Sequence, residues 1–120
     1  MKADIQQFIG LLFASSDYAH KMHLATDSYA QHMALGAFYE DIIGLADELA
    51  EAWMGRNLQK IGEIPTINVP KGEPLNVFKR LLEVVQDTRD FCENDTVLSN
   101  IIDEIESVYS SALYKLKFLK

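Results

Sequence analysis

The chain has 120 residues, of which 48% are hydrophobic, and its formal net charge is −7. That length suits a single domain, and we assign residues 1–120 to it. The negative charge repels polyanions, so direct DNA binding is unfavourable. No segment approaches the roughly 20 apolar residues that cross a bilayer, and no convincing signal-peptide cleavage site follows the amino terminus. We therefore expect a cytoplasmic protein without a membrane-spanning segment.

The first predicted helix runs from about Ala3 to Leu24. Its apolar stripe recurs at steps of three and four residues, which is the spacing of one face of an α-helix, and includes two polar members. The stripe consists of Ile5, Phe8, Ile9, Leu12, Ser16, Ala19 and His23. The next residues include the sequence TDS at 26–28, and all three residue types suit a helix N-cap. A short turn there therefore joins this helix to a second one.

The second predicted helix extends to about Met54 and ends at Gly55. Its apolar face consists of Leu35, Phe38, Ile42, Leu45, Leu49 and Trp53. Gly36 and Gly44 interrupt this helix, and each costs about 1 kcal/mol relative to alanine. We therefore expect another group to approach the backbone closely at both glycines.

Residues 55–73 form a long connection, since prolines and glycines within it or next to it prevent a continuous helix. These residues are Gly62, Pro65, Pro70, Gly72 and Pro74. Pro74 suits the first position of a third helix, where its missing N–H is harmless. That helix continues to about Cys92, which we expect to be a buried thiol.

A fourth helix runs from about Val97 to Phe118, after a turn at residues 93–96. The chain thus consists of two helical hairpins with short turns, joined by one long connection. This pattern predicts an all-α fold, a ferritin-like four-helix bundle rather than a simple up-and-down bundle.

All three histidines lie near the first predicted turn, as His20, His23 and His32. His20 stands six residues before a turn centred near Thr26, and His32 stands six residues after it. Positions equidistant from the turn of an antiparallel hairpin lie at the same height, so these two imidazoles can approach each other. His23 falls within the apolar stripe instead, and we interpret it as a hydrogen-bonded core residue rather than a ligand.

Three carboxylates follow along the second helix. Asp47 and Glu51 are four residues apart and share a face, and Glu40 lies on nearly the same stripe. Two imidazoles and two carboxylates suit iron, manganese or zinc. Within one chain, however, the helical rise separates His32 from Asp47 by about 22 Å. The ligands converge only if a second copy packs its helix antiparallel to this one, so the spacing predicts a homo-oligomer, at least a two-fold dimer through this helix.

The same four residues follow the signature of a known family. The mini-ferritins that protect bacterial DNA during starvation (Dps-like proteins) carry a histidine, a second histidine twelve residues later, an aspartate fifteen beyond and a glutamate four further on. That register is met by His20, His32, Asp47 and Glu51. The chain resembles this family, and the resemblance implies an intersubunit ferroxidase site that takes Fe(II) to Fe(III); other divalent metals suit the same donors. The chain departs from the mini-ferritin signature at Gly36, where those proteins carry a further carboxylate. Glu40, one helical turn further on, is the nearest carboxylate that could replace it.

A second resemblance covers nearly the whole chain. The segment HLATDSYAQHMALGAFYE and the ending LYKLKFLK resemble uncharacterised ferritin-like proteins found in phage genomes. This resemblance implies the same fold and, for a phage-encoded chain, a place in the host cytoplasm. It implies no established activity.

Two other functions stay open, so the sequence does not decide whether the chain is an enzyme. The first is a non-enzymatic ferritin-like dimer that binds a host protein or a small ligand, which Gly36 in place of a ligand favours. The second is an all-α nucleotide pyrophosphohydrolase, because Glu48 and Glu51 have the ExxE spacing with which such enzymes hold Mg²⁺. The second motif of that class is imperfect here, since Glu83 and Asp87 are four residues apart rather than three.

Overall fold

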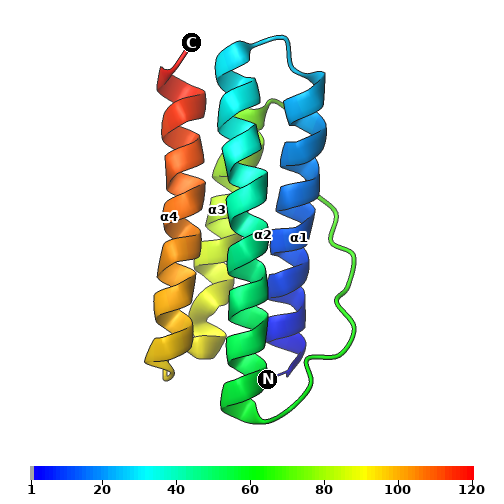
Figure 1. Ribbon diagram of the computed structural model, residues 1–120, viewed down its shortest axis with the longest axis vertical. Coiled ribbons are helices and arrows are strands. Elements are labelled where there is room, and N and C mark those ends of the chain that lie inside the picture. Colours follow the sequence, from blue (N-terminus) through cyan, green and yellow to red (C-terminus); the bar gives the residue numbers. More distant parts are fainter. Residues whose placement is uncertain (1) are drawn as a thin grey trace.

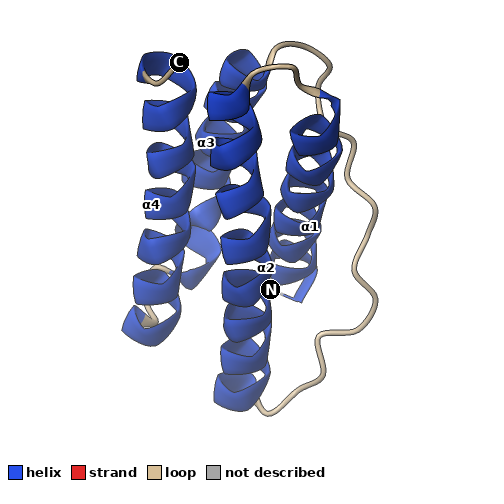
Figure 2. Ribbon diagram, turned by 45° about the horizontal axis from the view of Figure 1, so that its top comes forward, coloured by secondary structure: helices blue, strands red, loops and turns tan. Residues whose placement is uncertain are grey.

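The computed structural model describes residues 2–120 of the chain. Figure 2 shows that this part consists of helices and loops. The elements are α1 (Lys2–Ala25), α2 (Tyr29–Asn57), α3 (Pro74–Thr88), the 3₁₀ helix η1 (Arg89–Cys92) and α4 (Thr96–Phe118). The predicted all-α class with four α-helices is therefore confirmed. Among the described helices, none is long and apolar enough to cross a membrane.

The connection between α2 and α3 crosses the length of the bundle (Figure 1). α2 returns antiparallel to α1, and residues 58–73 then run back beside α1 to the end at which α2 began. α3 consequently runs parallel to α2, and α4 runs antiparallel to α3. α1 and α4 each pack against both α2 and α3, which gives an elongated bundle of 45 × 24 × 21 Å.

The core lies where the predicted apolar stripes meet. Near its centre, Phe38 of α2 packs edge-on against Phe78 of α3 and Tyr109 of α4, at ring-centroid distances of 4.6 and 4.9 Å. Tyr109 is fully buried, and its hydroxyl donates a 2.8 Å hydrogen bond to Ser15 Oγ of α1. Burial raises the pKa of Tyr109, so its hydroxyl stays protonated and remains a donor. All four helices therefore meet through these few residues.

Two predicted helix ends are wrong. α2 continues through Gly55 to Asn57, because a glycine costs a helix only about 1 kcal/mol and does not by itself end it. The left-handed conformation that terminates α2 falls on Leu58, with φ at 49°. The last turn of the third predicted helix is the separate 3₁₀ helix η1, in which the Cys92 thiol is buried as expected.

Gly10 allows the connection to pack against α1. A Cβ atom at this position would lie 2.7 Å from the carbonyl oxygen of Pro65 and 3.0 Å from Cγ1 of Ile67. The first distance is well inside van der Waals contact, and a closely packed interior has no spare volume to relieve it. The path of the connection therefore depends on a glycine within α1, a contact that the sequence pattern did not reveal.

Replacing Gly10 by alanine should destabilise the protein. The added Cβ atom pushes the connection away from α1 at a cost of about 1–3 kcal/mol, which outweighs the gain of about 1 kcal/mol in helix propensity. Gly55→Ala is the matched control, since no described atom outside its own stretch of helix lies within 4 Å of its Cβ position. The control should raise the free energy of unfolding by up to about 1 kcal/mol. Urea unfolding followed by circular dichroism measures both variants, and equal stabilisation by the two would contradict the docking of the connection on Gly10.

Candidate functional site

The turn between α1 and α2 is held by the residues predicted to cap α2. Ser28 is the N-cap, and its Oγ accepts a 3.2 Å hydrogen bond from the Gln31 backbone N–H. Thr26 Oγ1 accepts a 3.1 Å hydrogen bond from the Ser28 N–H and donates one of 2.6 Å to Gln31 Oε1. These local bonds place the carboxyl end of α1 beside the amino end of α2.

The imidazoles of His23 and His32 stack across this hairpin. Their ring centroids are 3.7 Å apart, and their planes differ by 20°. His23 Nδ1 lies 2.6 Å from the His32 carbonyl oxygen, and His32 Nδ1 lies 2.8 Å from the His23 carbonyl oxygen. Because a carbonyl oxygen only accepts, each Nδ1 carries a proton and donates, and in the neutral form of this tautomer Nε2 is free of a proton. His23 is thus hydrogen-bonded as expected, but it lies half-buried at the hairpin rather than in the core.

His20 extends the same group of rings along α1. Its imidazole is exposed and stacks on the ring of Tyr39, with centroids 4.1 Å apart and planes within 6°. The His20 and His23 rings are 6.4 Å apart, and Tyr39 lies 5.5 Å from His23. We call His20, His23, His32 and Tyr39 the histidine cluster. Among the described ring contacts none joins His20 directly to His32, the approach that the spacing predicted; His23, which contacts both, links them within the cluster.

Gly36 faces the imidazole of His23. A Cβ atom at Gly36 would lie 3.0 Å from Cε1 and 3.1 Å from Nδ1 of that ring. The close approach expected at Gly36 is confirmed. At Gly44 the same expectation is wrong within the chain, because no described atom lies within 4 Å of its Cβ position. His23 therefore occupies the space beside the position at which mini-ferritins carry their further carboxylate.

The three carboxylates predicted as metal ligands lie apart from the histidine cluster. Glu40, Asp47 and Glu51 are exposed along α2, and within residues 2–120 none of them makes a hydrogen bond or an ion pair. In the same part of the chain, no three side chains of the metal-binding types come close enough to hold one ion. Within the described residues the histidine cluster and these carboxylates therefore lie apart, and we call them the two candidate half-sites.

Two partly exposed apolar side chains lie along the hairpin at a level between the candidate half-sites. The 3.1 Å hydrogen bond from Ser16 Oγ to the Tyr39 carbonyl oxygen helps to set the register of α1 against α2. In that register, Phe13 of α1 is nearly level with Ile43 of α2. The two side chains are 37% and 38% exposed. Each helix of the hairpin thus exposes one large apolar side chain at about this level.

The acidic pairs that suggested a pyrophosphohydrolase lie on different helices. Glu48 and Glu51 are on α2, and Glu83 and Asp87 are on α3. Within the described chain these helices stand at diagonal corners of the bundle, and their backbones do not come close, although core side chains such as Phe38 and Phe78 meet between them. Glu83 lies 3.7 Å from Arg80. The structure therefore does not bring the two acidic motifs together.

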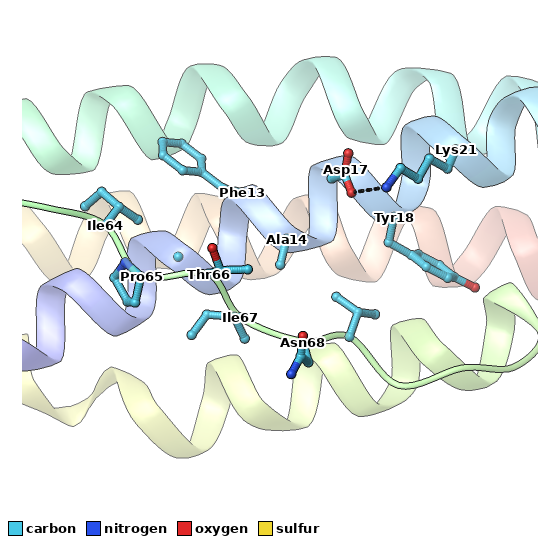
Figure 3. A pocket seen from close by; sticks show the side chains of 12 residues that line it. Phe13, Ala14, Asp17, Tyr18, Lys21, Ile64, Pro65, Thr66, Ile67 and Asn68 are labelled. Atoms are coloured by element: carbon cyan, nitrogen blue, oxygen red, sulfur yellow. Dashed lines mark ion pairs between the residues drawn. The ribbon is translucent and has the colours of Figure 1, made fainter.

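A groove of about 700 Å³ lies between α1 and the connection (Figure 3). Its lining includes Phe13, Ala14, Asp17, Tyr18 and Lys21 of α1 and residues 64–69 of the connection. Asp17 and Lys21 form an ion pair of 2.9 Å, and the Tyr18 hydroxyl donates a 3.2 Å hydrogen bond to the Gly72 carbonyl oxygen. Burial, together with the negative charge of Glu73, raises the pKa of Tyr18 to about 12. The titratable groups of this groove are thus engaged within the chain, and we do not assign it a chemical role.

The comparisons with known proteins give one family and one relative. The model of a family of unknown function, DUF5856, matches residues 23–116. An uncharacterised 14.6 kDa protein from the mobD-rI intergenic region of Enterobacteria phage T4 is 28% identical over 116 residues, which are 96% of this chain and 88% of the phage protein. No solved structure gives a significant match. The predicted resemblance to a phage protein is confirmed, and neither match carries a ferritin or mini-ferritin description.

The substitutions Gly36→Ala and His23→Ala should have coupled effects on stability. In the parent protein, the new Cβ atom at position 36 presses on the stacked imidazole, and the free energy of unfolding should fall by about 1 kcal/mol. In the His23→Ala background the ring is gone, so the same substitution should gain up to about 1 kcal/mol from helix propensity. Urea unfolding of both single variants and the double variant gives the coupling energy. Purely additive effects would show that Gly36 does not serve to accommodate His23.

Proposed function

The chain belongs to DUF5856, a family of unknown function, and from this starting point we propose that it is a ferritin-like protein that binds iron, or another divalent metal, between two copies of itself. The observation that carries the proposal is the 2.8 Å hydrogen bond from His32 Nδ1 to the His23 carbonyl oxygen. Metal-ligating histidines ordinarily donate their second ring nitrogen to an oxygen in this way, which fixes the tautomer and the ring orientation. His32 is thereby prepared to bind a metal through Nε2.

The path of the chain supports the ferritin-like part of the proposal. Ferritin-like bundles consist of two helical hairpins joined by one long crossover. Residues 58–73 make a crossing of that kind, between the parallel helices α2 and α3 (Figure 1).

The two half-sites meet if α2 packs antiparallel to the α2 of a second copy. The two-fold axis then passes near Glu40, which is about midway between His32 and the two carboxylates further along the helix. Phe13 and Ile43, each more than a third exposed, lie close to this axis and would bury against their counterparts. Burial of apolar side chains at the axis is what would hold the two copies together.

Each dimer would contain two equivalent sites. His20 and His32 of one copy would supply imidazole nitrogens, and Asp47 and Glu51 of the other would supply carboxylate oxygens. This donor set fits first-row transition metals, because imidazole suits them and the carboxylates balance their charge. In the ferroxidase reaction Fe(II) is the substrate and Fe(III) the product, and O₂ or peroxide takes up the electron. The chain's own contribution is to orient His32 and to gather the donors at the interface.

Anaerobic titration of the purified protein with Fe(II) should show binding to a dimer. His20→Ala combined with His32→Ala should weaken Fe(II) binding at least tenfold, because it removes both nitrogen donors. Asp47→Asn combined with Glu51→Gln should weaken it similarly. Glu48→Gln is the matched control, since Glu48 is an exposed carboxylate on the same helix outside the proposed ligand set. Calorimetry measures the affinity, and sedimentation velocity gives the oligomeric state.

Two outcomes would contradict this proposal. One is a dimer that takes up no Fe(II). The other is a protein that stays monomeric at every concentration, with or without metal. If Fe(II) does bind, the growth of ferric absorbance after addition of O₂ or peroxide measures whether the site also oxidises it.

A non-enzymatic helical dimer that binds another protein or a small ligand is the second candidate. The observation that favours it is His23, which fills the space beside Gly36 where a mini-ferritin has its further carboxylate. The His20→Ala, His32→Ala variant separates the two candidates. A dimer that binds no Fe(II) in its parent form, and whose biological activity is unchanged in this variant, would favour the second.

A further inference from the structure

Large apolar side chains are exposed at the end of the bundle where α2 begins and α4 ends (Figure 1). They are Tyr29, Met33, Tyr114, Phe118 and Leu119. Tyr29 is 75% exposed and Phe118 is 63% exposed. The rings of Tyr114 and Phe118 lie 5.7 Å apart. Exposed apolar side chains that gather in one place mark an interaction surface more often than isolated ones do.

Three of these side chains, Tyr29, Met33 and Leu119, line a groove between α2 and α4. A cavity of about 490 Å³ lies between Tyr29, Met33 and Leu119, and a second hollow of about 150 Å³ continues it toward Asp41. Both are lined by Ala34, Ala37 and Lys115. We call the two together the α2–α4 groove. Its floor consists largely of small side chains, so the backbone of another helix can approach closely, as when a helix lies in a hydrophobic groove.

The charge of the α2–α4 groove is opposite to that of the chain as a whole. Lys115 and Lys120 line it, and Lys117 is in the same last turns of α4, with Nζ 6.0 Å from the ring centroid of Phe118. Within residues 2–120, none of these three lysines forms an ion pair with a carboxylate. Asp41 is the acidic residue at the opposite end of the groove. The lysine end therefore attracts acidic groups, although the net charge of the chain is −7.

We propose that the α2–α4 groove binds an amphipathic α-helix of an acidic partner protein. The apolar face of that helix lies on the alanine floor between Tyr29 and Leu119, and its acidic residues pair with Lys115 and Lys120. The groove follows α2 from about residue 29 to residue 41, which corresponds to about 18 Å or three helical turns of the partner. None of the residues in the proposed metal site lines this groove, so the inference stands apart from metal binding.

Shape and charge favour such a helix over other occupants. A concave groove between two helices fits the convex surface of a third helix, whereas a membrane surface is flat on this scale. A second copy seated here about a two-fold axis would set one concave groove against another, which would leave the hollow unfilled. An acidic partner helix fits the shape of the groove and supplies carboxylates to the unpaired lysines.

The test is a titration of the ¹⁵N-labelled full chain with a designed helical peptide of about 14 residues, or four turns. The peptide carries leucines on one face and glutamates on the other, and its twin carries lysines in place of the glutamates. The acidic peptide should perturb the amides that line the α2–α4 groove, and the basic twin should bind at least tenfold more weakly. Lys115→Glu and Ala37→Trp should each weaken binding of the acidic peptide at least tenfold, by reversing the charge and by filling the groove. Lys79→Glu, the same charge change on an exposed position of α3, should leave the affinity unchanged.

Four results would overturn the proposal. The first is that the acidic peptide causes no amide shifts in the groove, and the second is that the two peptides bind equally. The third is that amide shifts in the groove depend on protein concentration without any peptide. The fourth is that Lys115→Glu and Ala37→Trp leave peptide binding unchanged. The third would assign the groove to a second copy. Binding of the chain to vesicles of phosphatidylserine and phosphatidylcholine, lost in Lys115→Glu, without binding of the acidic peptide would assign it to a membrane surface instead.

Discussion

The stacking of His23 on His32 is the contact on which the site depends. The two reciprocal hydrogen bonds from ring nitrogens to carbonyl oxygens join the end of α1 to the start of α2, and so fix the register of this hairpin. Gly36 makes the contact possible, because any larger residue there would meet the His23 ring. The register, also held by the hydrogen bond from Ser16 to Tyr39, brings Phe13 of α1 nearly level with Ile43 of α2.

The same contact also limits what His23 can do. The planes of the two stacked rings differ by only 20°, so the lone pairs of their Nε2 atoms point along nearly parallel planes and do not converge on one ion. In the proposed site, His23 would therefore support His32 rather than act as a further ligand. The two exposed sides of α2 then differ in character. The side next to α1 carries acidic and histidine half-sites for a proposed metal, and the side next to α4 carries a basic, apolar groove for a proposed helix.

Local patterns were sufficient to predict the helices and the first turn. The apolar stripes form the core because residues three and four apart share a face of any α-helix. Thr26 and Ser28 hold the turn as expected, since a side chain that caps a helix needs only neighbours two or three residues away. The end of α2 could not be predicted in this way. Its left-handed residue is Leu58 rather than Gly55, because a glycine permits that conformation without requiring it.

Some features of the candidate site could likewise be predicted from local spacing, and others could not. The equal distances of His20 and His32 from the turn were enough to predict that they belong to one cluster. The rise of the helix was enough to predict that Asp47 cannot reach them within one chain. The stacking of His23 on His32, like the packing of Pro65 on Gly10, could not be read in advance. The height and the face of a residue on a helix follow from its position in the sequence alone. The meeting of side chains across helices depends on how the whole bundle packs, because the space open to each ring is set by atoms far away in the sequence.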